Sequence, residues 1–344
     1  MAGMSQRITL AHIAAAAGVS VATVSVVLSR REGSIKVGDD TRKRVLDQAR
    51  KLGYRANTTA QSLRLGRSRT VGVALDDITV PFLAEIIHAA ARALRQADHG
   101  CLLIDLPPGS ESRRAGLELF QSGRVDAVLL AGATSTVDDL TIRSIARQGL
   151  PVVLVERTLA APGVTSLTID NSLGGGLAVG HLIASGRKSL ACITGPAGNA
   201  VAQERLAGAR LAAQAGEVAL RPNLIVAGDW SLESGSAAMA ALIATGRPID
   251  AVFAANDMMA VGALRVLRDL GRRVPGDIAV IGYDDLPLAA FVDPPLSTIR
   301  QSAAAMGREA ARLILAALGQ PTGEATPETL RPELVVRSST RKIP

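Results

Sequence analysis

The sequence predicts an α/β protein that begins with a small all-α domain and continues as a two-lobed core with parallel sheets. Residues 9–28 read TLAHIAAAAGVSVATVSVVL, which is typical of two short helices joined by a tight glycine turn. From Thr70 onward short apolar segments alternate with helical ones, and this alternation is typical of parallel sheets covered by helices on both faces. With 344 residues, 48% of them hydrophobic, the chain is long enough for two or three domains.

The paired helices have recognisable caps. The hydroxyl of Thr9 can cap the first helix, whose apolar residues follow at helical spacing. Gly18 ends this helix, because glycine tolerates the left-handed backbone of a sharp exit. Ser20 can cap the second helix, which is expected from about Val21 to Leu28. An ordinary helical hairpin and a helix-turn-helix that places its second helix in DNA both fit this pattern.

The charge distribution favours the DNA-binding alternative. The first 69 residues contain 13 Lys and Arg against four acidic residues, whereas the whole chain contains 38 and 31, with a net charge of +7. The rest of the chain is therefore slightly acidic. A local cationic excess attracts phosphates and releases their counterions, so the basic segment predicts binding to double-stranded DNA.

A third helix and a hinge complete the amino-terminal region. The third helix is expected to be capped by Asp39 or Asp40, to run through Leu52 and to be ended by Gly53, which gives a headpiece over residues 1–56. Residues 57–69 include NTTAQSLRL, which predicts a short hinge helix that needs a partner, with Leu63 as an apolar wedge for the minor groove. A plain basic linker is the alternative for this segment.

Residues 70–344 are expected to form the core. One set of strands is expected at 71–75, 101–106, 127–132 and 152–156, and a second at 190–195, 224–228, 251–257 and 278–285. The two sets imply an N-lobe over about 70–168 and 300–328 and a C-lobe over about 169–299 and 329–342. Ligands of parallel sheets bind beyond the carboxyl ends of the strands, which between two lobes means the cleft.

Six segments carry a resemblance that covers nearly the whole chain. They are TLAHIAAAAGVSVATVS, RVLDQARKLGYRAN, AQSL, ERLAG, AANDMMAVGAL and IAVIGYDD. Their order and spacing resemble the lactose-repressor/galactose-repressor (LacI/GalR) family of bacterial transcription regulators. The resemblance implies a homodimer whose headpieces and hinge helices grip a near-palindromic operator, and a periplasmic-binding-protein-like core that closes on a small effector. The predicted function is a repressor under effector control.

The resemblance also implies which residues contact DNA. Backbone-contacting hydroxyls and phosphate contacts near the hinge are expected at Thr9, Ser20, Thr23, Ser25, Tyr54 and Asn57, with Leu63 intercalating and Arg64 beside the phosphates or the groove. The family's variable base readers correspond to Val21, Ala22 and Val26. Because these apolar side chains make no bidentate hydrogen bonds to base edges, we expect specificity to depend on the hinge wedge, DNA deformability and Arg30 or Arg31.

The effector site is expected at strand ends and at one helix. Arg205 in ERLAG can offer a planar fork to hydroxyls or a carboxylate, and Trp230 can stack on a sugar ring. Asn256 and Asp284 match the family's ligand-binding Asn and Asp, and Asp76 and Glu156 end the first and fourth strands. Each also has a structural alternative, such as an ion pair, hinge packing or a helix cap. The mixture suits a polyol, so we expect a sugar.

Other classes of function are less well supported by the sequence. Gly174, Gly176 and Gly180 have the wrong spacing for a dinucleotide fingerprint and favour close helix packing, while the four histidines show no metal spacing. No catalytic residue, metal or cofactor is expected. Cys101 and Cys192 are expected to be buried thiols, and without a signal core or a long apolar run we expect a cytoplasmic protein with no membrane partner. The alternatives are a sugar-binding protein of the periplasmic type without a specific operator, and a regulator that senses a nucleobase or another metabolite.

Overall fold

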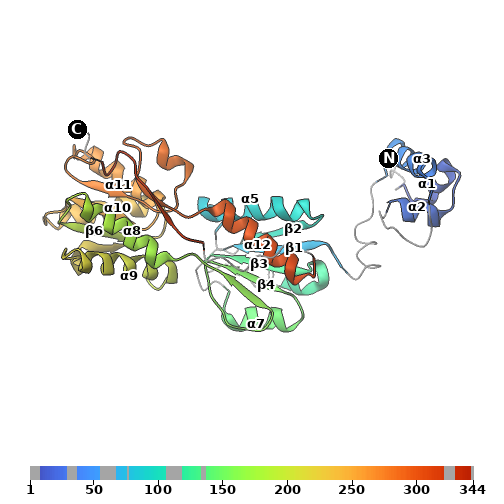
Figure 1. Cartoon of the computed structure of the whole chain (residues 1–344), viewed down its shortest axis with the longest axis horizontal. Helices are drawn as coiled ribbons and strands as arrows, with labels where there is room; N and C mark the ends of the chain where they lie inside the picture. Colours follow the sequence, from blue (N-terminus) through green and yellow to red (C-terminus); the bar gives the residue numbers. More distant parts are fainter. Residues whose placement is uncertain are drawn as a thin grey trace, which may run out of the picture. The chain divides into compact units, whose positions relative to one another are not determined.

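The computed structural model describes residues 8–28, 37–54, 67–75, 77–105, 118–132, 137–320 and 330–341. The chain divides into two compact units (Figure 1). Met1–Ser68 contains the headpiece, and Arg69–Pro344 is the core. The predicted hinge helix with Asn57, Leu63 and Arg64 lies outside the described residues, and so do Arg30, Arg31 and Asp76.

The headpiece is a three-helix domain. Its helices are α1 (Leu10–Ala17), α2 (Val21–Leu28) and α3 (Asp39–Lys51), packed around buried apolar side chains from all three. Gly18 has a φ of 64°, as the sharp exit from α1 requires, and Ser20 Oγ accepts a hydrogen bond from the backbone amide of Thr23 at 3.1 Å. The predicted start of α3 needs correction, because Gly38 occupies the capping position.

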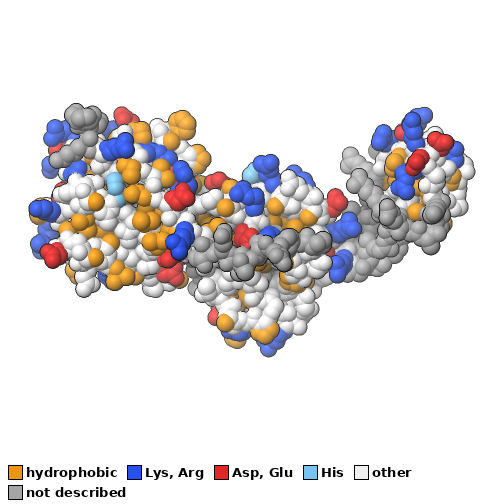
Figure 2. Space-filling model, viewed as in Figure 1, with side chains coloured by type: hydrophobic (Ala, Val, Ile, Leu, Met, Phe, Trp, Pro, Cys, Tyr) orange, Lys and Arg blue, Asp and Glu red, His pale blue; other side chains and the backbone are white. Residues whose placement is uncertain are grey.

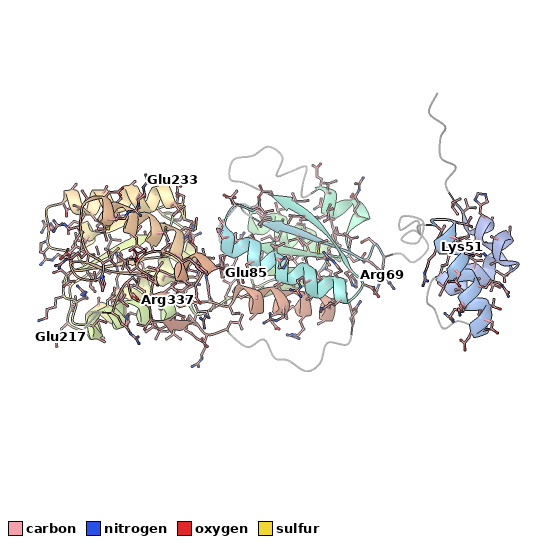
Figure 3. All side chains as sticks on the ribbon, turned by 90° about the horizontal axis from the view of Figure 1, so that it is seen from above. Lys51, Arg69, Glu85, Glu217, Glu233 and Arg337 are labelled. Atoms are coloured by element: carbon pink, nitrogen blue, oxygen red, sulfur yellow. The ribbon has the colours of Figure 1, made fainter. Side chains whose placement is uncertain are left out.

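The N-lobe is a five-stranded parallel sheet in the order β2-β1-β3-β4-β5. Its strands are β1 (Thr70–Leu75), β2 (Gly100–Asp105), β3 (Ala127–Ala131), β4 (Val152–Val155) and β5 (Val164–Leu167). Alternate residues of these strands supply two hydrophobic clusters, one on each face. One face is covered by α5 (Pro81–Gln96) and α12 (Ala303–Ala317), which lie side by side in Figures 1 and 3, and the other by α7 (Asp139–Arg147) and the π-helical turn η1 (Phe120–Arg124).

The C-lobe is a four-stranded parallel sheet in the order β7-β6-β8-β9. Its strands are β6 (Leu190–Thr194), β7 (Ile225–Ala227), β8 (Ala251–Ala254) and β9 (Ala279–Ile281), and β7 follows the short 3₁₀ turn η2 (Pro222–Leu224). Helices α8 (Asn171–Ala184) and α9 (Ala200–Ala215) cover one face, and α10 (Leu232–Ala244) and α11 (Asp257–Asp269) cover the other. A 3₁₀ turn, η3 (Pro287–Ala290), follows β9.

The chain passes between the two sheets at three places. It leaves β5 for α8 near Ile169, which pairs with Leu330 on the returning segment. It leaves β10 (Thr298–Arg300) for α12, and it returns to β11 (Glu333–Val335), which pairs antiparallel with β10. These neighbouring crossings connect the lobes.

The structure corrects two predictions, the burial of the Cys101 thiol and the close packing at Gly180. Cys192 is buried, but Cys101 is exposed because β2 forms an edge of its sheet. A Cβ on Gly174 would lie 2.1 Å from Tyr283 Oη, so close packing explains this glycine, whereas nothing lies within 4 Å of a Cβ on Gly180.

Among the described residues, no group of three or more His, Cys, Asp or Glu is placed to hold a metal ion. No single helix there is long and apolar enough to cross a membrane, and α1 and α2 meet that test only as a pair bent by 107°.

Candidate functional site

A cavity of about 260 Å³ lies where the carboxyl ends of both sheets face each other. The N-lobe contributes residues that follow β1, β3 and β4, together with the start of α5. The C-lobe contributes residues that follow β6, β7, β8 and β9, together with α9. The lining residues are Asp77, Val80, Phe82, Leu83, Gly132, Glu156, Pro196, Asn199, Val201, Arg205, Asp229, Trp230, Asn256 and Asp284.

Arg205 lines this cavity and is almost fully buried. Its Nη1 donates to the backbone carbonyl of Ala255 at 2.6 Å, and its Nε donates to Asn171 Oδ1 at 3.0 Å. Its guanidinium lies 3.6 Å from Asp284 Oδ1, in the C-lobe, and 4.0 Å from Glu156 Oε1, in the N-lobe. Arg205 therefore links carboxylates of the two lobes.

Two side chains after β9 shape the environment of Arg205. The Tyr283 ring lies 3.7 Å from the guanidinium carbon, in a cation–π arrangement. Asp284 Oδ1 accepts a hydrogen bond from Gln301 Nε2 at 2.7 Å, and Gln301 belongs to a crossing between the lobes. Burial raises the pKa of Asp284 to about 6, although Arg205 and Gln301 act in the opposite direction.

Asn256 holds Trp230 in place. Its Oδ1 caps α11 by accepting from the backbone amide of Met259 at 2.9 Å, and its Nδ2 donates to the Trp230 carbonyl at 3.0 Å. The indole packs on Gly195, where a Cβ would lie only 2.2 Å from the ring. The sequence prediction placed Asn256 among the ligand contacts, and the structure shows that its side chain also has these two internal partners.

Three predicted site residues have left-handed backbones. Their φ angles are 66° for Glu156, 76° for Trp230 and 109° for Asp284. Such conformations cost non-glycine residues free energy and are concentrated at ligand sites, where the surrounding structure holds side chains in a required direction. Glu156 directly follows β4, and Trp230 and Asp284 are each the third residue after the ends of β7 and β9.

The structure brings five of the six predicted effector residues to one cavity, namely Glu156, Arg205, Trp230, Asn256 and Asp284. The sixth, Asp76, lies outside the described residues. Sequence reasoning missed Asp77, Phe82, Asn199 and Asp229. Asp77 and Asp229 closely follow strand ends, and Phe82 is one of only four phenylalanines, so both signals were available.

The predicted DNA-contacting residues that the structure describes lie in or beside α1 and α2, except Tyr54, which follows α3. Thr9, Ser20, Val21 and Ala22 are exposed, with Val21 at 47%, while Thr23, Ser25, Val26 and Tyr54 are partly buried. Lys and Arg side chains are visible on the headpiece in Figure 2. Arg44 donates to the Ala17 carbonyl at 2.9 Å, so α3 fixes the end of α1 beside the turn.

An exposed helix-turn-helix and a two-lobed core whose cavity is lined by apolar and charged side chains define a ligand-responsive DNA-binding protein. The profile of the bacterial regulatory proteins of the lacI family matches residues 9–57, and that of a periplasmic binding protein-like domain matches residues 179–340. The transcriptional regulator CelR of Thermobifida fusca is 37% identical over 341 residues, which cover 97% of this chain and 98% of CelR.

Two solved structures show the same architecture. The complex of CelR with cellobiose has a TM-score of 0.70 at 34% identity and covers 97% of this chain and all of CelR. The Lac repressor dimer bound to operator and the anti-inducer ONPF has a TM-score of 0.82 at 27% identity, over 97% of this chain and 99% of the repressor. This chain belongs to the lacI family of bacterial regulatory proteins. It is a DNA-binding transcription regulator controlled by an effector.

Proposed function

We propose that the effector is a sugar, bound in the cavity between the lobes by Glu156, Arg205, Trp230, Asn256 and Asp284, with Asp76 as a sixth contact expected from the sequence. The observation that carries this proposal is the position of Arg205 between carboxylates of opposite lobes. Carboxylates and a guanidinium match the hydroxyls of a polyol, and the indole of Trp230 offers a face for its ring. The cellobiose complex of CelR supports a sugar over a nucleobase or another metabolite.

The proposed mechanism is a shift between open and closed lobes. The contact between Arg205 Nη2 and Glu156 Oε1, at 4.0 Å, is long for an ion pair, so a ligand hydroxyl between the lobes would add bonds to both sides. A ligand that binds the closed arrangement better shifts the population toward it. In the family, ligand can either release the operator or act as a corepressor, and titration of operator binding with ligand distinguishes the two.

On the DNA side, we propose that a near-palindromic operator is gripped by two headpieces. Exposed Val21 and Ala22 would make apolar contacts, for instance with thymine methyl groups, and the hydroxyls of Thr9 and Ser20 would contact the backbone. Leu63 and Arg64 remain the proposed groove contacts of the hinge. Replacing Leu63 with Ala should abolish operator preference, and full preference in a competition gel shift would contradict this role.

We further propose that the protein acts as a homodimer. The Lac repressor dimer supports this, and so do apolar side chains that the single chain leaves exposed. Leu103 on edge strand β2 is 44% exposed, and Leu288 and Phe291 after β9 are 41% and 86% exposed. Replacing Phe291 with Asp should weaken the dimer in sedimentation experiments, whereas an unchanged dimer would place the interface elsewhere.

A thermal-shift screen of the full-length protein against sugars, polyols and nucleobases tests the effector proposal, because a ligand that prefers the folded state raises the melting temperature. We expect a sugar to raise it. Arg205→Met should abolish the rise, while Arg210→Met, an exposed position on the same helix, should preserve it. A rise with nucleobases alone, or an undiminished rise in Arg205→Met, would contradict the proposal.

A further inference from the structure

The charges that line the cavity are unbalanced. Among the described lining residues, Arg205 is the only cation, while Asp77, Glu156, Asp229 and Asp284 are acidic. Two of the acids, Glu156 and Asp284, have side chains only 9% and 6% exposed and lie within 4.0 Å of Arg205. The single positive charge therefore already has two buried carboxylate neighbours.

The remaining donors of Arg205 are also partly used. Its Nε and Nη1 donate to Asn171 and to the Ala255 carbonyl, and its face lies against Tyr283. An anionic ligand group would have to compete with these partners and approach two carboxylates at the same time. Charge repulsion at such distances in a partly buried site is costly.

The other two acids lie closer to solvent and come from different lobes. Asp77 follows β1, and its Oδ1 accepts from the backbone amide and the hydroxyl of Thr79 at 2.7 and 2.6 Å. Asp229 follows β7, and its Oδ1 accepts from the backbone amide of Ser231 at 3.0 Å. Hydrogen bonds from Ser231 and Ser234 lower the pKa of Asp229, so this carboxylate is charged at neutral pH. A ligand entering the cavity therefore meets acidic groups from both sheets.

We propose that the cavity selects an uncharged, hydroxyl-rich effector and rejects anionic ones such as sugar phosphates, aldonic acids and nucleotides. This inference rests on the proposed function, because it concerns the same effector site. The carboxylates offer several hydrogen-bond acceptors, and Phe82 and Trp230 add one aromatic side chain from each lobe. A neutral ligand with many hydroxyl donors satisfies the acceptors without adding negative charge.

Trp230 gives a direct probe of this charge, because it is the only tryptophan in the chain and lines the cavity. Its fluorescence in the full-length protein is quenched with iodide, caesium and acrylamide at equal ionic strength. Because iodide is intrinsically the stronger quencher, the quenching by each ion is divided by its quenching of free N-acetyltryptophanamide, and these normalised values are compared. A negative potential should make caesium at least about 3-fold more effective than iodide, with acrylamide as the neutral reference. Equal quenching by the two ions, or stronger quenching by iodide, would overturn the proposal.

Two variants test which side chains produce the negative potential around Trp230. Asp77→Asn, in the lobe opposite Trp230, should lower the caesium-to-iodide ratio, because Asp77 faces the same cavity. Glu217→Gln should leave the ratio unchanged, since Glu217 is an exposed residue that follows α9 and lies away from the N-lobe (Figure 3). If the ratio is unchanged in Asp77→Asn, the N-lobe does not contribute to the negative potential. The proposal that acidic groups from both lobes reject anionic ligands would then be wrong.

A second experiment compares the binding of neutral sugars with that of their anionic derivatives, measured by Trp230 fluorescence. The pairs are cellobiose with its aldonic acid, and glucose with glucose 6-phosphate. For any pair that binds, we expect the charged member to bind at least tenfold more weakly, and equal or tighter binding of the charged member would overturn the proposal. If caesium quenching dominates but no sugar binds, the sugar proposal fails and charge selection stands. If neutral sugars bind but iodide quenches equally well, charge selection fails and the sugar proposal stands.

Discussion

At the scale of single residues, the carboxylate of Asp284 is the group whose charge state matters most. Its folded-state pKa is about 6, against an ordinary value of 3.8, because burial disfavours the charged form. Between these two pH values the folded protein holds a proton that the unfolded chain has lost. Raising the pH through this window therefore deprotonates a buried group, and the stability of the fold decreases.

We expect the pH dependence of stability to differ between the wild type and Asp284→Asn. From pH 4 to pH 7 the free energy of unfolding of the wild type should fall relative to that of the variant by about 2 kcal/mol, because most of the effect of a shift of about two pKa units falls in this range. Chemical unfolding at several pH values measures it. Burial and the charge of Asp284 both raise the pKa of Asp257, so the variant also changes how Asp257 titrates, and the pH dependence reports the two coupled carboxylates together. A difference that does not change with pH would show that Asp284 titrates normally.

The sequence predicted the identity of the site residues better than their internal bonds. Strand-end position and family resemblance were enough to predict Glu156, Arg205, Trp230 and Asp284, which all line the cavity. The two hydrogen bonds of Asn256 depend on where α11 starts relative to Trp230, and this is set by three-dimensional packing. Asp77 also follows a strand end, but it was missed because its neighbour Asp76 is an acid as well, and the sequence does not show which of two consecutive carboxylates faces the cleft.

At the scale of elements, the close contact of α8 and α9 positions Arg205. A Cβ on Gly175 of α8 would lie 1.9 Å from the Arg205 carbonyl oxygen, and one on Gly208 of α9 would lie 1.8 Å from the Ser172 carbonyl oxygen. The two helices can therefore approach at backbone distance only because both positions are glycine.

Gly175→Ala should destabilise the core by about 1–3 kcal/mol, because the added methyl group meets backbone that moves only with the whole helix. Gly180→Ala, on the same helix with nothing within 4 Å of its Cβ, should instead stabilise the protein by up to about 1 kcal/mol through helix propensity. Urea unfolding of the two variants makes the comparison. Equal effects would mean that the helices can separate at little cost.

The main strands were predictable because each forms a continuous apolar segment, and the paired helices because of their caps. Strands β5, β10 and β11 were missed. They have three or four residues each, and β5, with the sequence VTSL, is only partly buried. The exposure of Cys101 follows from the edge position of β2, which depends on strand order and not on the composition of the strand.

At the scale of the whole molecule, DNA binding and effector binding should respond differently to salt. The basic amino-terminal segment binds phosphates, so operator affinity should fall on the order of 10³-fold between 50 and 200 mM salt if about six phosphates are contacted. Binding of a neutral effector in the core should change little over the same range. Fluorescence anisotropy of labelled DNA and Trp230 fluorescence measure the two on one protein, and a salt-independent DNA affinity would contradict the charge argument.

The most direct test of effector control is selection of genomic fragments by the full-length protein, with and without the sugar identified by thermal shift. We predict enrichment of a near-palindromic sequence whose retention changes when the sugar is added. The Arg205→Gln variant should still bind the same DNA sequence but should no longer respond to the sugar, because the cavity and the headpiece belong to separate units of the chain. No preferred sequence under either condition, or an Arg205→Gln variant that still responds fully, would contradict the account.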